Sequence, residues 1–340
     1  MVDADWVKWE GNRSVSEVIA IEVSFINLIL LGGIYVGWNV GANDTANCIG
    51  TVVGAGLIPY RKAVILVAVF AFLGAVFQGH HVMNTIGKGI VTEKLPYLAI
   101  FVVLICAGFF VTIATFFGVP VSTSQSMVGG VLGIGLAIGA NVDFSEVTTI
   151  VESWVVCPIL TMCLSFAIVH LLGFIIRRLR YHLVLVRTML GWLTLLSACY
   201  VAYAMGANNA GNAVGPIANL EIIHPRVLVA IGGGALAIGA ITYGHKVADT
   251  IGKDITPLDF SGAFAAQVSS AFGIHLFSIW GIPLSSSAAI VGAVAGVGLV
   301  KGVRSMRSKT ILTIMVGWVL VPCFAGISSF LLYRVICLLK

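Results

Sequence analysis

The chain has 340 residues, of which 59% are hydrophobic and only 10% charged, and its mean hydropathy is +1.05. Because an ordinary soluble domain carries about 25% charged residues, this composition excludes a soluble protein and predicts a polytopic membrane protein with little chain left for an extramembrane domain. The net charge of +5 is modest for this length and argues against a nucleic-acid partner.

Ten apolar segments predict an all-α membrane protein, because a helix needs about 20 apolar residues to cross the bilayer. In chain order they cover residues 19–40, 63–83, 96–118, 121–140, 148–176, 184–205, 226–243, 260–281, 284–300 and 309–338. Residues 1–18 precede them and are predicted to form an extracellular N-terminal segment. The serine-rich segments, 121–140 and 284–300, either span the membrane or enter and leave it from the same side.

The two halves of the chain match at a nearly constant offset, which indicates an internal duplication. The matching pairs are Gly41-Ala42-Asn43 with Gly206-Ala207-Asn208, Gly79-His80 with Gly244-His245, and Asn84–Lys88 with Asp249–Lys253, all at 165 residues, and Pro120–Ser124 with Pro283–Ser287 at 163. We therefore predict two transmembrane repeats of five segments, 19–176 and 188–340, joined by a basic linker at 177–187.

Because five is odd, the second repeat should be inverted in the membrane relative to the first. Twelve of the 19 basic residues then fall on one side, namely Arg61, Lys62, Arg177, Arg178, Arg180, Arg187, Lys246, Lys253, Lys301, Arg304, Arg307 and Lys309. Cytoplasmic loops are enriched in Lys and Arg, so we expect a cytoplasmic linker and both termini outside. Inverted repeats with broken or re-entrant helices indicate a secondary transporter.

The motifs Gly41–Asn47 and Gly206–Asn212 follow two of the apolar segments and indicate a solute site. Glycine frees the backbone from the helix, and Asn and Asp supply oxygen ligands and amide donors. We therefore expect two unwound breaks that face each other near the middle of the bilayer. A buried Asp44 is costly unless paired, and together with Asn43 and Asn47 it predicts a sodium site. The alternative is a cluster of interhelical hydrogen bonds without a ligand.

The motifs Pro120–Ser126 and Pro283–Ala288 indicate an oxyanion site. Ser and Thr after proline suit a helix N-cap, and the N–H groups and hydroxyls at this positive end of a helix could hold a tetrahedral oxyanion. Simple capping or packing between helices is the alternative. Without a nearby arginine, binding would depend on dipoles, hydroxyls and a cation. Phosphate could donate a proton to Asp44, whereas sulfate would be repelled unless a cation intervened.

Other chemistries find no support in the sequence. The seven cysteines have no paired ligand spacing, so we expect neither a disulfide framework nor a zinc site, and no cofactor. No set of nucleophile, base and orienting residue predicts an enzyme. No Walker motif predicts an ATP-driven pump.

Together these motifs resemble the PiT inorganic phosphate transporters, a family of ion-coupled symporters that includes related sulfate permeases. The duplicated Gly-Ala-Asn-Asp-x-Ala-Asn signature, the stretch Thr85–Val91 and the run Pro120–Ser124 carry the resemblance, which covers nearly the whole chain. It implies an inverted-repeat fold, transport of inorganic phosphate with sodium or protons, and often a homodimer. It also implies phosphate contacts from Asn43, Asp44, Ser122, Thr123, Ser124, Asn208, Ser285, Ser286 and Ser287, and sodium near Asp44, Asn47 and Asn212.

The chain departs from the family pattern at Asn209, where aspartate is usual, and at Gly211, where alanine is common. As further polar members of the motifs, Gln125 and Asn209 complete the predicted substrate site. We predict a prokaryotic, multi-pass cell-membrane protein that imports inorganic phosphate with sodium by alternating access. A sulfate permease of the same fold, coupled to sodium or protons, is the alternative, and a passive anion channel is a weaker one.

Overall fold

The computed structural model of the chain describes residues 15–54, 56–119, 121–179, 183–245, 258–302 and 308–339. The helices in these residues are α2 (Val15–Gly54), α3 (Tyr60–Asn84), the π-helix η1 (Thr85–Gly89), α4 (Tyr97–Phe116), α5 (Thr123–Ile138), α6 (Phe144–Leu179), α7 (Leu183–Ala218), α8 (Pro225–Tyr243), α10 (Phe260–Ile279), α11 (Ser286–Lys301) and α12 (Ser308–Leu338). Within these described residues, eight helices are long and apolar enough to cross a membrane, and α5 and α11 are shorter apolar helices. The predicted all-α, multi-pass architecture is confirmed.

Many large apolar side chains face outward, and the motif segments of the two central helices are small or polar. Phe77, Phe116 and Val319 are about two-thirds exposed, at 65%, 65% and 66%. The buried stretch Gly206–Asn212 of α7 consists instead of glycine, alanine and asparagine, and Gly41–Asn47 of α2 adds only Asp44 and Thr45 to these residue types. This distribution suits a protein whose outer surface contacts lipid, because lipid does not favour burial of apolar side chains and small residues let helices approach closely.

The two predicted helix breaks are wrong. Helix α2 runs without interruption through Gly41–Asn47, and α7 runs through Gly206–Asn212. The glycines serve close helix crossing instead: a Cβ atom at Gly41 would overlap the backbone oxygen of Leu236 in α8, and one at Gly206 would overlap that of Ala71 in α3. Glycine is therefore required here for contact between helices, and the backbone keeps its helical hydrogen bonds.

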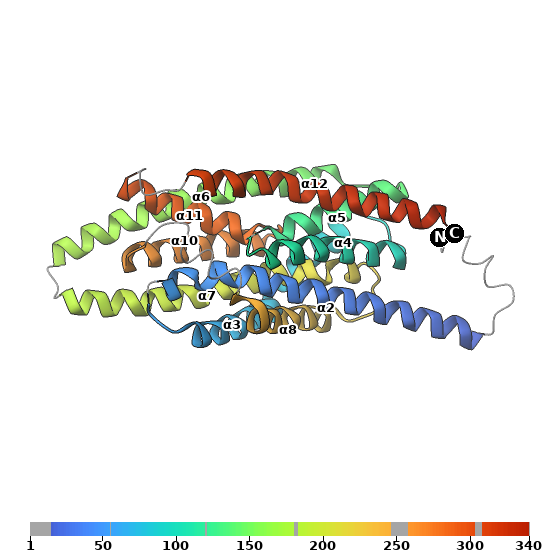
Figure 1. The fold of residues 1–340 in the computed structure, drawn as a ribbon, viewed down its shortest axis with the longest axis horizontal. Helices are drawn as coiled ribbons and strands as arrows, with labels where there is room; N and C mark the ends of the chain where they lie inside the picture. Colours follow the sequence, from blue (N-terminus) through green and yellow to red (C-terminus); the bar gives the residue numbers. More distant parts are fainter. Residues whose placement is uncertain are drawn as a thin grey trace.

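The second repeat is inverted relative to the first, as predicted. In Figure 1, α2 begins at the right-hand end of the molecule, whereas its counterpart α7 begins at the left-hand end, where α6 stops. The two repeats are also interleaved, because α2 packs on α8, α3 on α7, α5 on α12 and α6 on α11. Helices α2 and α7, which carry the Gly-Asn motifs, thus each lie among helices of both repeats.

The interruptions lie in the proline-serine motifs, where two helical hairpins turn. Helices α4 and α5 form one hairpin in the right half of Figure 1, and α10 and α11 form the other in the left half. Gly118 and Gly281 turn the chain with φ values of +68° and +76°, which glycine adopts without strain. The tips meet: the Ser287 hydroxyl donates to the backbone oxygen of Val121 at 3.5 Å. Both segments are therefore re-entrant in form.

The predicted linker is mostly helical, since residues 177–179 end α6 and residues 183–187 begin α7. The predicted N-terminal segment falls largely outside the described residues, which begin at residue 15. The same is true of Pro120 and of the basic residues Arg180, Lys246, Lys253, Arg304 and Arg307. The division into repeats at 177–187 and the side of the membrane for each terminus stay predictions.

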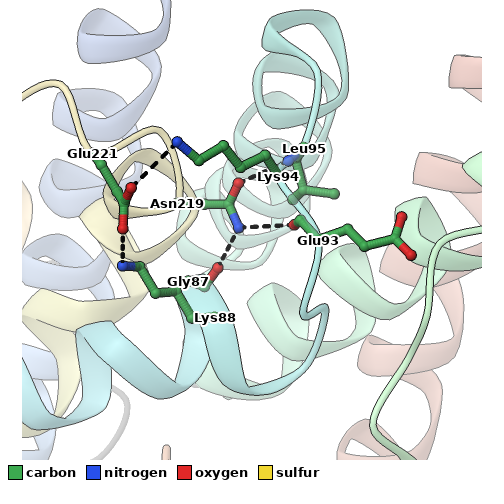
Figure 2. Close-up of polar contacts among 7 residues, drawn as sticks. All are labelled: Gly87, Lys88, Glu93, Lys94, Leu95, Asn219 and Glu221. Atoms are coloured by element: carbon green, nitrogen blue, oxygen red, sulfur yellow. Dashed lines mark hydrogen bonds and ion pairs between the residues drawn. The ribbon is translucent and has the colours of Figure 1, made fainter. Parts of the chain in front are cut away.

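A polar contact connects the end of α7 to the first repeat (Figure 2). The Asn219 amide donates to the backbone oxygens of Gly87 at 2.7 Å and Glu93 at 3.1 Å, and its oxygen accepts from the N–H of Leu95 at 2.7 Å. One side chain thus satisfies one backbone group of η1 and two in the irregular segment that follows it. It fixes this segment, which precedes the α4–α5 hairpin, against the end of α7.

Glu221 reinforces the same connection from a strained position. Its carboxylate forms an ion pair with Lys88 and a second with Lys94 at 3.2 Å (Figure 2). Its φ is +58°, and the matching residue of the first repeat, Gly56, has a φ of +70°. A glutamate in the left-handed region costs about 1 kcal/mol or more relative to glycine, so the two ion pairs are the compensating contacts that we identify.

Candidate functional site

The centre of the molecule is a direct contact between the two repeats. The Asn209 amide donates to Oδ2 of Asp44 at 2.7 Å, and both side chains are buried. The two residues occupy equivalent positions, 165 residues apart, in α7 and α2. The contact therefore lies where the repeats meet, and it is short because its acceptor is a carboxylate.

Hairpin residues surround this contact in matched fashion. The Thr123 hydroxyl of α5 donates to Oδ2 of Asp44 at 3.2 Å. In the second repeat, the Asn209 amide donates to the Ser286 hydroxyl of α11 at 3.0 Å. Thr123 and Ser286 are the first helical residues of α5 and α11 and are related by the offset of 163. The first turns of both short helices thus converge on the Asp44–Asn209 pair.

Two further asparagines connect each long helix to the hairpin of the other repeat. Asn47 donates to the Ser287 hydroxyl at 3.1 Å, and Asn212 donates to the Ser124 hydroxyl at 2.7 Å. Asn47 also approaches Oδ1 of Asp44 at 3.4 Å. These crossed contacts make the centre depend on both repeats at once.

Asn43 and Asn208 hold the hairpin turns. Asn43 donates to the Thr115 hydroxyl at 2.8 Å and to the backbone oxygen of Val119 at 3.1 Å, and it accepts from the N–H of Val121 at 3.1 Å. Asn208 makes the equivalent three contacts, with Ser278, Ile282 and Leu284, each at 3.1 Å. In this structure their amides are occupied by the turns, which indicates a positioning role.

The serines that begin the short helices act as N-caps. The Ser122 hydroxyl accepts from the N–H of Gln125 at 3.2 Å, and the Ser285 hydroxyl accepts from that of Ala288 at 3.1 Å. Capping, the alternative noted for these motifs, is therefore present. The preceding N–H groups of each first turn have no intrahelical acceptor and lie at the positive end of the helix dipole. They form a favourable environment for an anion.

Three buried amide oxygens beside these contacts have no hydrogen-bond donor among the residues that the structure describes. They are Oδ1 of Asn47, Oδ1 of Asn212 and Oε1 of Gln125. A buried polar atom without a partner costs about 1–3 kcal/mol, so it needs an explanation such as a ligand, an ion or water. Oxygen atoms without donors next to a carboxylate fit a cation better than they fit an anion.

All the predicted site residues come together at this centre, and it is closed to solvent. None of the members that follow is more than 4% exposed: Asn43, Asp44, Asn47, Ser122, Thr123, Ser124, Gln125, Asn208, Asn209, Asn212, Ser285, Ser286 and Ser287. Asp44 is the one ionisable residue among them. A solute could reach the centre only after the surrounding helices moved.

The sequence motifs did not include three residues that hold the site in place by contacting its asparagines or the backbone of α2. Thr115 and Ser278 are related by the offset of 163, so the repeat alignment contained a signal for this pair. Gln267 of α10 donates to the backbone oxygen of Cys48 at 2.8 Å and joins the second hairpin to α2. Its equivalent in the first repeat is Leu104, so no repeat signal pointed to it.

Comparisons with known proteins agree on one family. The profile of the phosphate transporter family matches residues 40–329. A protein of Chlamydia muridarum named as a candidate phosphate permease is 31% identical, over 91% of this chain and 98% of that protein. The chloroplast inorganic phosphate transporter 2-1 of Arabidopsis thaliana is 28% identical, over 93% of this chain and 73% of that protein.

A solved structure has the same fold. The protein described as the sodium-dependent phosphate transporter superposes with a TM-score of 0.85 and 28% identity, covering 93% of this chain and all of that one. This likeness extends over both repeats and both hairpins.

Proposed function

The chain belongs to the phosphate transporter family, and from this premise we propose that it imports inorganic phosphate together with sodium by alternating access. The observation that carries the proposal is the buried junction of Asp44, Asn209 and the first turns of α5 and α11. This junction combines a positive environment for an oxyanion with one carboxylate for a cation. The family is one of transporters, so we propose no enzymatic activity.

Phosphate would lie between the first turns of the two short helices. The N–H groups and hydroxyls of Thr123 and Ser124 would bind it from one side, and those of Ser286 and Ser287 from the other. Asp44 supports phosphate over sulfate, since a phosphate that carries a proton can donate it to a carboxylate. Sulfate has no such proton near neutral pH, so Asp44 would repel it unless a cation intervened.

Sodium would bind at the carboxylate. Oδ1 of Asp44 has a single long contact, the one with Asn47 at 3.4 Å, and the amide oxygens of Asn47 and Asn212 have no donors. Carbonyl and carboxylate oxygens are the ligands that bind sodium in secondary transporters. A cation here would also offset the charge of phosphate nearby, which supports coupled binding of the two solutes.

Alternating access is supported by the arrangement of the hairpins. They approach the centre from opposite halves of the molecule (Figure 1) and contact each other between Ser287 and Val121. Movement of one hairpin would open the centre to one side while the other kept it closed. A closed, fully buried centre argues against a passive channel. We place the protein in the cell membrane with both termini outside, and pairing of two copies stays a prediction from the family resemblance.

The test is uptake of radiolabelled phosphate by the purified protein in liposomes. We expect uptake that requires an inward sodium gradient and that unlabelled phosphate inhibits more strongly than sulfate. Equal inhibition by sulfate would favour the permease alternative, and uptake without any cation gradient would favour a channel.

Asp44→Asn should remove sodium-dependent uptake while the protein stays folded, because the two side chains have nearly the same shape. Loss of one partner of a buried charge pair costs about 2–5 kcal/mol, which corresponds to roughly 30-fold or more in affinity. The control is Asp143→Asn at the exposed start of α6, where Asn can keep the cap on Ser145 and Glu146. Normal sodium-driven uptake by Asp44→Asn would contradict the site.

A further inference from the structure

The two halves of the site match in residue type except at the charged position and at Gln125, whose counterpart is Ala288. Asparagine occupies both 43 and 208 and both 47 and 212, and a hydroxyl residue occupies both members of the hairpin pairs 122/285, 123/286 and 124/287. Asp44, in contrast, is matched by Asn209. The carboxylate is therefore present in one repeat only, at the point where the two repeats touch.

We propose that Asn209 limits this transporter to one coupling cation for each phosphate, bound on the Asp44 side of the centre. The inference rests on the proposed function and specifies its stoichiometry. Two observations lead to it: how much of the hydrogen-bonding capacity of Asn209 and Asp44 is already occupied, and how much negative charge is available to bind a second cation.

Asn209 has no open ligand to offer. Its amide nitrogen donates to Asp44 at 2.7 Å and to Ser286 at 3.0 Å. Its oxygen accepts from the Ser124 hydroxyl at 3.2 Å and from Asn212 at 3.1 Å. Two donors and two acceptor positions are thereby occupied, which is the full capacity of an amide.

Asp44 is used on one oxygen only. Oδ2 accepts from Asn209 and Thr123, whereas Oδ1 has the single contact with Asn47 at 3.4 Å. The oxygen that remains open thus lies on the first-repeat side, next to the unpartnered Oδ1 of Asn47. The unpartnered oxygen of Asn212 on the second-repeat side has no carboxylate of its own repeat beside it.

Charge then decides how many cations can be held. A cation taken out of water into a buried site needs an opposite charge in addition to neutral oxygens. The Asn209 amide group donates a hydrogen bond to Asp44 and lies in the position that a second cation would otherwise occupy. If residue 209 were a carboxylate, two like charges would face each other, and a second cation would be needed to hold them.

The experiment measures the sodium-to-phosphate flux ratio with both solutes radiolabelled, and uptake as a function of sodium concentration, in liposomes. We expect one sodium per phosphate in the wild type and a Hill coefficient of about one, because the Hill coefficient cannot exceed the number of coupled sites. Asn209→Asp should raise the flux ratio to two and the Hill coefficient toward about two. Asn209→Ala, the matched control without a new charge, should weaken sodium affinity and leave the ratio at one.

A charge exchange tests the position of the cation. Asp44→Asn alone should lose sodium-dependent uptake, and Asp44→Asn with Asn209→Asp should recover it in part with a ratio of one, because the single carboxylate is moved to the other repeat. Absence of recovery in a double variant that elutes as the wild type does on size exclusion would contradict the cation assignment.

Failure of this inference can be told apart from failure of the proposed function. Two sodium ions per phosphate in the wild type would overturn the inference and leave sodium-coupled transport intact. No sodium-dependent uptake in the wild type would overturn the proposed function itself. The wild-type ratio decides the matter even if Asn209→Asp does not fold.

Discussion

Single side chains hold the turns of the two hairpins, and the clearest cases are Asn43 and Asn208. Each amide makes three hydrogen bonds within one turn, and each turn contains a glycine in the left-handed conformation. The hydroxyls and N–H groups that begin α5 and α11 follow directly after these turns. The position of the proposed anion site is therefore set by two asparagines that need not touch the anion.

We predict that Asn43→Ala and Asn208→Ala destabilise the protein to a similar extent. Each buried group left without a partner costs about 1–3 kcal/mol, and the two sites are equivalent. Thermal unfolding in detergent would measure this, with Asn141→Ala at an exposed position as the control. Lost phosphate uptake with unchanged stability would instead mean that these asparagines bind the anion directly.

At this scale the sequence predicts which residues gather but not how each is used. Duplicated polar residues in apolar segments must face protein or a cavity, and among the described residues the structure brings both motif pairs into contact. Whether Asn43 binds a solute or a turn depends on the path of residues 117–122 in space. That path follows from packing that no local pattern records.

Whole helices approach closely where glycine replaces a side chain. We predict that Gly41→Ala prevents correct assembly of α2 on α8, because the added methyl group would overlap the backbone oxygen of Leu236, which cannot move independently of its helix. Expression and monodispersity in detergent would measure the effect. Gly234→Ala in α8 is the control, since a Cβ atom there meets nothing within 4 Å, and it should be neutral or stabilise by up to about 1 kcal/mol. Equal behaviour of the two variants would contradict the close crossing.

The contact at the end of α7 should depend on pH through Glu221. Hydrogen bonding and charge from Lys88, and then from Lys94, hold the pKa of Glu221 below its usual value. A carboxylate with a depressed pKa in the folded state stabilises the protein above its unfolded-state pKa, and this contribution disappears as the pH falls through the folded-state value. The difference in thermal stability between wild type and Glu221→Gln should thus be present at neutral pH and decrease as the pH falls from the ordinary glutamate pKa, about 4.3, through the lower folded-state value.

Two controls make the Glu221 result specific. Glu152→Gln, in an exposed part of α6, should show no comparable difference at neutral pH. High salt should reduce the effect of Glu221→Gln, since exposed ion pairs are screened. A difference that persisted at acid pH would assign the effect to hydrogen bonding of the side chain and not to its charge, because glutamine keeps the same backbone strain at residue 221.

At the level of elements, the apolar pattern predicts ten helical segments, but the Gly-Asn motifs do not mark where the chain is interrupted. Apolar length fixes how much chain a helix contains, and Gly118 and Gly281 allow the two turns. The Gly-Asn motifs misled because glycine serves two purposes, release from the helix and close approach between helices. Only the position of the neighbouring helix, α8 for Gly41 and α3 for Gly206, shows which of these two purposes the glycine serves.

The molecule as a whole is an interleaved pair of inverted repeats, and only part of this was open to sequence reasoning. A constant offset and an odd number of segments predict duplication and inversion. They do not predict that α2 packs on α8 or that α5 packs on α12, because an offset identifies equivalent positions and says nothing about which surfaces meet. Interleaving explains why residues of both repeats contribute to one centre. It also means that a hairpin that moves must change its contacts with helices of the other repeat.

The proposed membrane orientation gives the last prediction. Positions at the start of α3 and in the segment after η1 lie on opposite sides if α3 crosses the membrane once, and the excess of basic residues predicts that the former is cytoplasmic. In a cysteine-free background, exposed Thr92→Cys should react with a membrane-impermeant maleimide in intact cells, whereas exposed Lys62→Cys should react only after permeabilisation. The reverse pattern would turn the protein over and make the termini cytoplasmic, and labelling of both positions in intact cells would contradict the single crossing.

Since the two repeats have opposite orientations, turning the molecule over would exchange the sides on which the hairpins open. Direction of transport would then have to follow from the sodium gradient and not from the orientation.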